Sequence, residues 1–189
     1  MADGPRRKQE IFKATLESLA EKGYERLTVE GVAERSGVNK TTIYRWWPSK
    51  AALLGDALVE ARALDFEVPD TGSLRGDLKA LLRGMAALLT TPPASDVAVA
   101  ALGAAVHNPD LAAGTRRFFA DRFARERPIF DRAVRRGELR SGNDAMMVVD
   151  LLAGAVWLRA VFRQLPLDND FTDRAVDLVL DGAGASTAR

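Results

Sequence analysis

The 189-residue sequence contains no cysteine and a single histidine, His107. The lack of cysteine excludes disulfides and thiolate metal sites and is consistent with a reducing compartment. One histidine excludes a histidine-rich metal site, and neither a glycine-rich phosphate loop nor a nucleophile motif is present. We therefore expect no catalytic residues, no metal site and no cofactor, and we predict that the protein is not an enzyme.

Long apolar runs are also lacking. No uninterrupted apolar stretch approaches the roughly 20 residues that span a bilayer, and the first ten residues lack the apolar region of a secretory signal. Apolar residues still make up 47% of the chain and charged residues 28%, which is typical of a globular protein. We expect a cytoplasmic location without a membrane partner. The net charge is only +1, so any site for a polyanion must arise from local clustering.

What is present is apolar spacing of helical period along most of the chain, without strand-like alternation or repeats. Gly23 is placed to end the first helix, and Thr28, Asn39 and Ser49 are placed to cap the next three. Pro48 stops the third helix, because its ring is incompatible with a helix interior. The pattern predicts an all-α protein of about nine helices.

The segment Pro69–Ser73 is the first strong linker signal. It divides a small N-terminal domain, 1–66, from a larger C-terminal domain, 67–189. Pro128 lies inside a long helical pattern, so we expect a kink or a break there. The last two helices are expected near Ala145–Leu165 and Phe171–Asp181.

Two short helices in the first domain are joined by a turn that contains Gly37, which is the helix-turn-helix pattern. Ala33 supplies a small residue where the helices cross, and Gly37 can adopt the left-handed conformation. The residues expected to fill the angle between the helices are Val32, Val38 and Ile43. A coincidental helical hairpin is the alternative, but the basic second helix favours the motif.

If Ile43 faces inward, Trp47 lies on the same side of the second helix and anchors it in the core. The opposite face combines hydrogen-bonding groups with positive charge: Lys40, Thr41, Thr42, Tyr44 and Arg45. Such a face suits the DNA major groove, and a solvated surface is the alternative. Trp46 lies at the edge, where its ring can be half buried while its N–H contacts a phosphate.

Phosphate contacts are expected on both sides of this helix. Thr28 and Lys50 stand at the starts of helices, where backbone amides and partial positive charge are available. Arg6, Arg7 and Lys8 form either an arm that contacts DNA or a solvated tail.

The run TVEGVAERSGVNKTTIYRWWPSKAALL resembles the DNA-binding domain of the tetracycline-repressor (TetR) family of bacterial regulators. The similarity covers about Ile11–Leu58, and its most specific part is G-V-x-x-x-T-I-Y-x-x-W/F-x-S-K. It implies a ligand-responsive homodimeric transcriptional regulator, usually a repressor, that binds a palindromic operator in double-stranded DNA. It also implies a C-terminal domain that binds a small-molecule effector and joins the subunits through its last two helices.

Carried over by position, the resemblance assigns base or phosphate contacts to Lys40, Thr41, Thr42, Tyr44 and Arg45, and phosphate contacts to Thr28, Trp46 and Lys50. The sequence departs from the family pattern at two places. Gly31 occupies a helix-interior position where alanine or a larger residue is common, and Trp46 stands where tyrosine or histidine is usual.

The C-terminal domain offers aromatic and flexible apolar side chains on several helices. A ligand pocket between helices is lined by side chains of this kind, although each of them can equally be ordinary core. The candidate lining residues are Met85, Leu88, Phe118, Phe119, Phe123, Trp157 and Phe162.

The small residues of Ala153–Ala155 allow another helix to approach closely. We expect the last two helices to contribute to a four-helix dimer interface, with packing inside one chain as the alternative. The apolar residues considered for that interface are Val149, Leu152, Val156, Val176, Val179 and Leu180.

Two other classes of function stay open: an all-α enzyme, and a protein-interaction module, each with an incidental helix-turn-helix. The lack of paired catalytic groups argues against the enzyme. Sequence-selective binding to an operator would exclude the interaction module.

Overall fold

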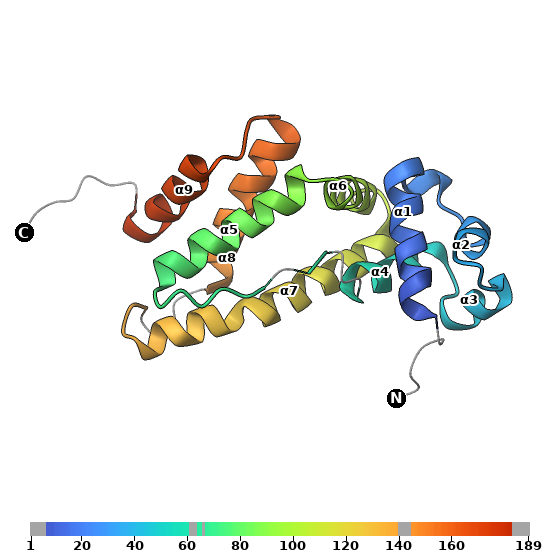
Figure 1. Cartoon of the computed structure of the whole chain (residues 1–189), viewed down its shortest axis with the longest axis horizontal. Coiled ribbons are helices and arrows are strands. Elements are labelled where there is room, and N and C mark those ends of the chain that lie inside the picture. The colour runs from blue at the N-terminus through green and yellow to red at the C-terminus, as the bar shows by residue number, and fades with distance from the viewer. Residues whose placement is uncertain (1–6, 61–63, 66, 140–144, 183–189) are drawn as a thin grey trace, which may run out of the picture. The chain divides into compact units, whose positions relative to one another are not determined.

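The computed structural model describes residues 7–60, 64–65, 67–139 and 145–182, and within these ranges it contains helices and no strand. The elements, shown in Figure 1, are α1 (Lys8–Arg26), α2 (Val29–Ser36), α3 (Lys40–Trp46), α4 (Lys50–Glu60), α5 (Leu74–Thr90), α6 (Ala94–Ala105), α7 (Pro109–Arg135), α8 (Ala145–Trp157), a π-helical turn (Leu158–Phe162) and α9 (Asn169–Asp181). The predicted all-α architecture of about nine helices is confirmed.

The predicted signals at the ends of the first helices are confirmed. Gly23 has a φ of 73° and interrupts the helical conformation near the end of α1. Thr28 and Asn39 cap α2 and α3 by accepting hydrogen bonds from backbone N–H groups of the first turn. Ser49 caps α4 in the same way, at 3.1 Å. These side chains satisfy donors that have no partner within the helix.

One compact unit lies within residues 1–65 and 91–122, so it combines α1 to α4 with α6 and the first part of α7. Its largest fully buried side chains include Phe12, Leu19, Ile43, Leu53, Leu54 and Leu111. The predicted division after residue 66 follows the linker in the sequence. The compact unit differs from that division because it also contains α6 and the first part of α7. The spacing of apolar residues within a segment does not reveal which distant segment it packs against.

The second compact unit lies within residues 66–90 and 123–189 and combines α5, the rest of α7, α8 and α9. Its buried core consists of Leu74, Leu78, Leu81, Leu82, Ile129, Phe130, Ala133, Leu152, Val156 and Val176.

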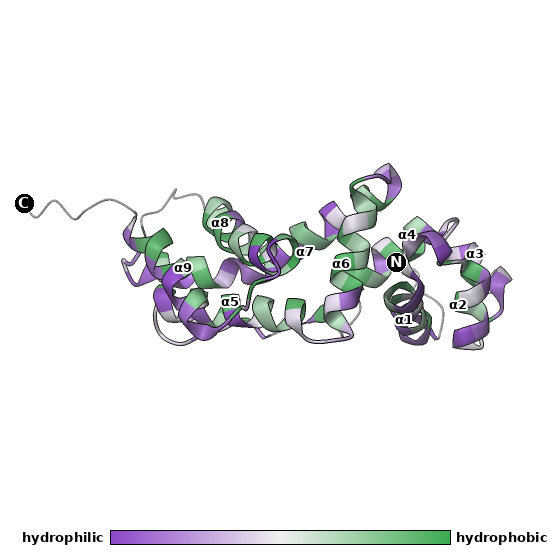
Figure 2. Ribbon diagram, turned by 90° about the horizontal axis from the view of Figure 1, so that it is seen from above, coloured by the Kyte–Doolittle hydropathy of each residue, from purple (hydrophilic) through white to green (hydrophobic). Residues whose placement is uncertain are grey.

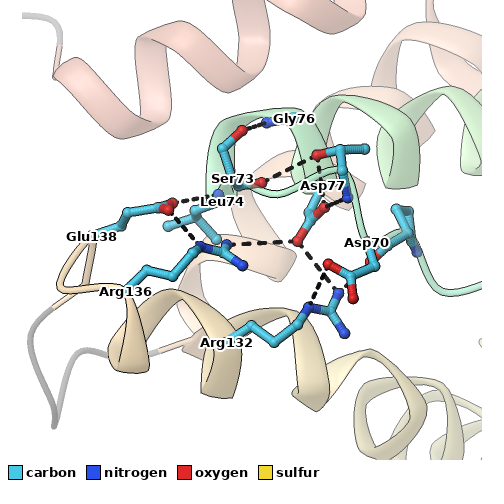
Figure 3. Close-up of polar contacts among 10 residues, drawn as sticks. Asp70, Ser73, Leu74, Gly76, Asp77, Arg132, Arg136 and Glu138 are labelled. Carbon is cyan, nitrogen blue, oxygen red and sulfur yellow. Dashed lines mark hydrogen bonds and ion pairs between the residues drawn. The ribbon is translucent and has the colours of Figure 1, made fainter.

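A buried carboxylate, Asp77, ties the start of α5 to the end of α7 (Figure 3). It accepts hydrogen bonds from the backbone N–H and the hydroxyl of Thr71, at 2.6 and 2.8 Å. Arg132 Nη2 lies 3.3 Å and Arg136 Nη2 3.8 Å from Asp77 Oδ2. Burying a carboxylate costs free energy unless it is paired, and the hydrogen bonds from Thr71 and Arg132, with the nearby charge of Arg136, compensate that cost.

The same two helical ends are joined at the surface by Glu138. Its carboxylate accepts a hydrogen bond from Arg136 Nε at 2.6 Å and another from the backbone N–H of Leu74. The hydrogen bond from Arg136, followed by the one from Leu74, lowers the pKa of Glu138 below its ordinary value.

Helices α5 and α9 face each other through a ladder of opposite charges, with three basic residues on α5 and three acidic residues on α9. The pairs are Arg75 with Asp181 at 2.6 Å, Lys79 with Asp177 at 3.0 Å and Arg83 with Asp173 at 2.6 Å. Because the residues on each helix are four apart, they share one face. The reversed order of the partners shows that the two helices are antiparallel and fixes their register.

Helix α7 continues through Pro128, so of the kink or break expected there, the break is wrong. A proline removes the hydrogen bond to the carbonyl four residues earlier, which belongs to Ala124. Both residues are exposed, so water can satisfy that carbonyl. The helix ends as predicted at Gly137, whose φ is 75°.

The stretch Ala145–Phe162, made of α8 and the π-helical turn, is long and apolar enough to cross a membrane by length and composition alone, although Asp150 and Arg159 lie in it. Only 11% of it is buried within the chain. Figure 2 shows apolar residues on much of α8. Several large apolar side chains of this stretch are exposed, including Met147, Leu151 and Leu158.

Candidate nucleic-acid interface

The angle between α2 and α3 is filled as the sequence predicts. Val32 and Ile43 are fully buried, and Ala33 and Val38 are half buried against the same core. Gly37 has a φ of 65° and ends α2 in the left-handed conformation. A side chain at this φ would strain the backbone, so Gly37 sets the direction in which α3 leaves α2.

The opposite face of α3 is exposed. Lys40, Thr41, Tyr44 and Arg45 are all exposed, and Thr42 is half buried. Within the described part of the chain, Lys40 and Arg45 take part in no ion pair. Two cations on one short helix are therefore not neutralised by an ion pair. Because the net charge of the whole chain is only +1, a site for a polyanion needs such a local cluster of basic residues.

Tyr44 has a partner that the sequence does not reveal. Its hydroxyl donates to Glu30 Oε1 on α2, at 3.3 Å. Partial desolvation and the nearby charge of Glu30 raise the pKa of Tyr44 above its ordinary value. The hydrogen bond thus orients the phenol of Tyr44 toward Glu30 in the first turn of α2.

The adjacent tryptophans are separated as predicted. Trp47 is 4% exposed, and its ring lies 5.4 Å from the ring of Phe12, centroid to centroid. Trp46 is 39% exposed. The backbone N–H of Trp47 donates to the carbonyl of Ile43 and closes α3. We call the exposed side of α3 its reading face and α3 the reading helix. The boundary between the reading face and the core therefore falls between Trp46 and Trp47.

Thr28 and Lys50 occupy the ends of their helices as expected. Thr28 Oγ1 accepts a hydrogen bond from the backbone N–H of Gly31, and a Cβ on Gly31 would lie 3.1 Å from that oxygen. The tight fit gives a physical reason for the glycine at this position. Lys50 Nζ donates to the carbonyls of Tyr24 and Glu25, at 2.8 and 3.2 Å, so the lysine also closes the end of α1.

Two basic residues at the start of α1, Arg7 and Lys8, contact other parts of the protein. Arg7 Nη1 donates to the carbonyl of Gly37 at 3.1 Å and also pairs with Glu10. Lys8 Nζ lies 2.5 Å from the carboxylate of Glu60. Arg6 lies outside the described residues. Arg7 thus holds the turn of the helix-turn-helix, a role that the sequence does not show because its acceptor is a backbone carbonyl.

The candidate effector residues are divided between the two compact units. Phe118 and Phe119 belong to the N-terminal unit, and their rings contact edge to face at 5.3 Å. Four others are half buried in the second unit: Met85, Leu88, Phe123 and Trp157. Phe162, also in the second unit, is 77% exposed.

The residues considered for the dimer interface face the chain's own core. Leu152, Val156 and Val176 are buried within one chain, and the remaining three pack against them half buried: Val149, Val179 and Leu180. Packing inside the chain, the alternative named for these residues, is what the structure shows. The outer face of the last helices carries a different apolar set: Met146, Met147, Leu151, Leu158, Phe162 and Leu178.

An exposed, basic reading helix held by a helix-turn-helix, in an all-α chain with a second helical unit, defines a DNA-binding transcriptional regulator. The family described as "Bacterial regulatory proteins, tetR family" matches residues 11–57, and "Tetracyclin repressor-like, C-terminal domain" matches residues 68–179. The chain belongs to the tetracycline-repressor family.

Full-length relatives agree with this. The chain is 35% identical to the DNA-binding transcriptional repressor TetR of Mycobacteroides abscessus, over 95% of each protein. It is 31% identical to the uncharacterized HTH-type regulator YdeS of Bacillus subtilis, over 94% of this chain and 90% of that protein. The crystal structure of the TetR family regulator SCO0332 superposes with a TM-score of 0.78 and 37% identity, covering 96% of this chain and 100% of that one.

Members of this family are transcriptional regulators and not enzymes; they bind DNA operators and small-molecule effectors and act as dimers. The sequence-based identification of a ligand-responsive transcriptional regulator is therefore confirmed.

Proposed function

We propose that this protein is a cytoplasmic repressor that binds a palindromic operator as a homodimer and leaves it when a small-molecule effector binds. The observation that carries the proposal is the outer face of α3, where Lys40 and Arg45 are exposed on a helix whose other side is fixed by buried Ile43. The named relative from Mycobacteroides abscessus is a repressor, which supports repression as the mode of action.

The exposed side chains of α3 suit different parts of the duplex. Arg45 and Lys40 can donate to the O6 and N7 atoms of guanine, and the methyl groups of Thr41 and Thr42 can contact thymine methyl groups. Trp46 flanks this face with an N–H that suits a phosphate oxygen, and Tyr44 can donate its O–H to such an oxygen in exchange for Glu30.

Thr28 and Lys50 frame the reading helix from neighbouring elements. The ammonium group of Lys50 has three donors, of which two point to carbonyls of α1. The third is available for a phosphate. Lys50 thus links the end of α1 to the DNA backbone, and its contribution to binding should be independent of base sequence.

A second copy of the chain is the proposed cover of the exposed apolar face of α8, the π-helical turn and α9. Met147, Leu151 and Leu158 lie at helical spacing on one side, all exposed, and the family acts as dimers. The dimer presents two copies of α3, which reach successive major-groove faces if they stand roughly 34–36 Å apart. The operator is then a palindrome, because the protein has two-fold symmetry.

The effector is proposed to contact the half-buried apolar residues of the second unit: Met85, Leu88, Phe123 and Trp157. Their chemistry suits an apolar or aromatic molecule with few polar groups. We assign Phe162 to the dimer face because of its exposure. The effector shifts the equilibrium between operator-binding and non-binding states only by its different affinity for the two.

The test is a selection of bound duplexes from a random pool, followed by variants. Arg45→Ala should relax base preference at one position of each half-site, at a cost of about 1–3 kcal/mol. Lys50→Ala should weaken binding to all sequences alike and reduce the dependence on salt. An unchanged base preference in Arg45→Ala would show that Arg45 does not read bases, and no enrichment of any duplex by the wild type would disprove the function itself.

A further inference from the structure

Helices α4 and α7 touch backbone to backbone inside the N-terminal unit. A Cβ placed on Gly114 would lie 2.7 Å from the Cα of Gly55, and one on Gly55 would lie 3.1 Å from the Cα of Gly114. Both glycines are buried. The crossing is therefore fixed by two residues without side chains, and any larger residue on α7 at this point would push the helices apart.

A single carboxylate next to this crossing joins three elements. Asp56 follows Gly55 on α4, and its Oδ2 accepts a hydrogen bond from the indole N–H of Trp47 at 2.8 Å. Its Oδ1 accepts a hydrogen bond from Arg117 Nη2 on α7, one turn beyond Gly114. Asp56 thus divides its two oxygens between the end of the reading helix and α7.

The position of Trp47 decides where the reading helix ends. Its backbone N–H closes α3 on Ile43 at 2.9 Å, and Trp46 and Arg45 precede it directly. A shift of Trp47 as a whole at its contact with Asp56 would therefore be passed to the last turn of α3, which carries proposed contacts to DNA. The contact with the ring of Phe12 and the hydrogen bond to Asp56 both restrict the position of the Trp47 side chain.

We infer that Asp56 is a positioning residue for operator binding, and that Arg117 on α7 sets its orientation. Asp56 touches no DNA and acts through Trp47; Arg117 acts through Asp56. Helix α7 continues beyond residue 122 into the second compact unit, so a change in α7 at its contact with α4 reaches the reading helix through this carboxylate. The inference rests on the proposed function for its meaning, but its geometry can be tested without DNA.

The first test is made on the full-length protein without DNA. The chain has three tryptophans, so a spectrum of ¹⁵N-labelled protein contains three indole N–H signals, assigned with Trp→Phe variants. Arg117→Gln should shift the Trp47 signal and leave the Trp157 signal in place. Arg117 is 60% exposed, so its replacement does not threaten folding. Arg116→Gln, the neighbouring exposed arginine, makes the same change of charge and should shift neither signal.

The second test measures affinity for the selected operator against salt concentration. Arg117→Gln should bind about threefold more weakly than Arg116→Gln, with the same salt dependence, because the lost charge contacts no phosphate. Asp56→Asn should weaken binding about tenfold, and adding Arg117→Gln to it should cause no further loss, because the two residues form one pathway. Arg117→Lys, which keeps the charge, should restore part of the affinity.

Three outcomes would overturn the inference: a Trp47 signal that Arg117→Gln leaves in place, full additivity of the two substitutions, or a lower salt slope in Arg117→Gln. The last would show that Arg117 itself contacts phosphate. If the wild type bound no duplex at all, the proposed function would fail, while the indole signals would still decide whether Asp56 links Trp47 to α7.

Discussion

At the scale of single residues, the two tryptophans that follow Arg45 have different surroundings. Trp47 is enclosed by Phe12 and Asp56, whereas Trp46 is partly in contact with solvent. The peptide bond between them is the boundary between the part of the molecule that holds the reading helix in place and the exposed part that is proposed to contact DNA.

Substitutions at the two tryptophans should therefore separate stability from binding. Trp47→Ala should lower the free energy of unfolding by about 3–5 kcal/mol, because it leaves a cavity in the core. Trp46→Phe should leave unfolding nearly unchanged and weaken operator binding, because it removes an N–H. Urea denaturation and operator titration of both variants check this. A Trp46→Phe protein that binds as tightly as the wild type would show that the indole N–H contacts nothing in the complex.

The hydrogen bond between Tyr44 and Glu30 predicts a change with pH. Desolvation, followed by the charge of Glu30, raises the pKa of Tyr44. The neutral phenol is the form favoured by folding, so its contribution to stability is full at neutral pH and is lost as pH rises through the raised pKa. In a Tyr24→Phe background Tyr44 is the sole tyrosine, and phenolate absorbance should show a midpoint above the ordinary value. Glu30→Gln should lower that midpoint, and an unmoved midpoint would leave Glu30 without influence on Tyr44.

Much of the reading face can be predicted from the sequence, because a helix of known ends fixes which side chains share a side. Ile43 and Trp47 are buried, and Lys40, Thr41 and Arg45 are exposed, as the helical period requires. What the sequence does not predict is which residues hold these side chains.

The sequence does not show these partners because they are brought together only by the tertiary structure. Glu30 for Tyr44, Asp56 for Trp47 and the carbonyl of Gly37 for Arg7 are separated from their partners by 14, 9 and 30 residues. No local pattern selects one acidic residue among many as the partner of a given donor.

At the scale of helices, signals at the ends are local and are read correctly, whereas the side that a helix buries depends on its neighbours. Thr28, Asn39 and Ser49 cap the helices expected of them. On α8 both sides are apolar, so the sequence cannot tell the side that faces α5 and α9 from the outer side. That is why Leu152 and Val156, considered for the dimer interface, are found in the core.

The buried carboxylate between α5 and α7 provides a prediction about elements. Asp77→Ala should lower the free energy of unfolding by about 3 kcal/mol or more, because it removes the buried carboxylate that Thr71, Arg132 and Arg136 share and leaves Arg132 with only the exposed Asp70 as its acidic partner. Asp70→Ala is the matched control: its side chain pairs with Arg132 at 3.2 Å but is 63% exposed, so its loss should cost less than about 1 kcal/mol. If urea denaturation showed the same decrease in the free energy of unfolding for both variants, the arginines would not be what stabilises the carboxylate of Asp77.

At the scale of the whole molecule, the apolar outer face of α8 and α9 and the single short reading helix are related, because each is explained by a second copy of the chain. A helix of 7 residues reaches only a few base pairs, which is too little for tight and specific binding. Two such helices joined in a fixed frame bind as a unit, and the second binding event becomes intramolecular. If this apolar face joins two copies of the chain, as proposed, it is also the surface on which the affinity of the reading helices depends.

A charge placed on this face should test the link between assembly and DNA binding. Leu151 is 53% exposed, so Leu151→Asp should leave the fold of one chain intact while opposing the burial of the face against a second copy. Sedimentation should show a monomer where the wild type is a dimer, and operator affinity should fall by about a hundredfold or more. The salt slope should also fall by about half, because only one reading helix engages phosphates. Val106→Asp, which places the same charge on a residue 77% exposed in the other unit, should change neither quantity. If Leu151→Asp were still a dimer, the dimer interface would lie elsewhere on the chain. If the wild-type protein bound lipid vesicles through this face, a membrane and not a second chain would cover it.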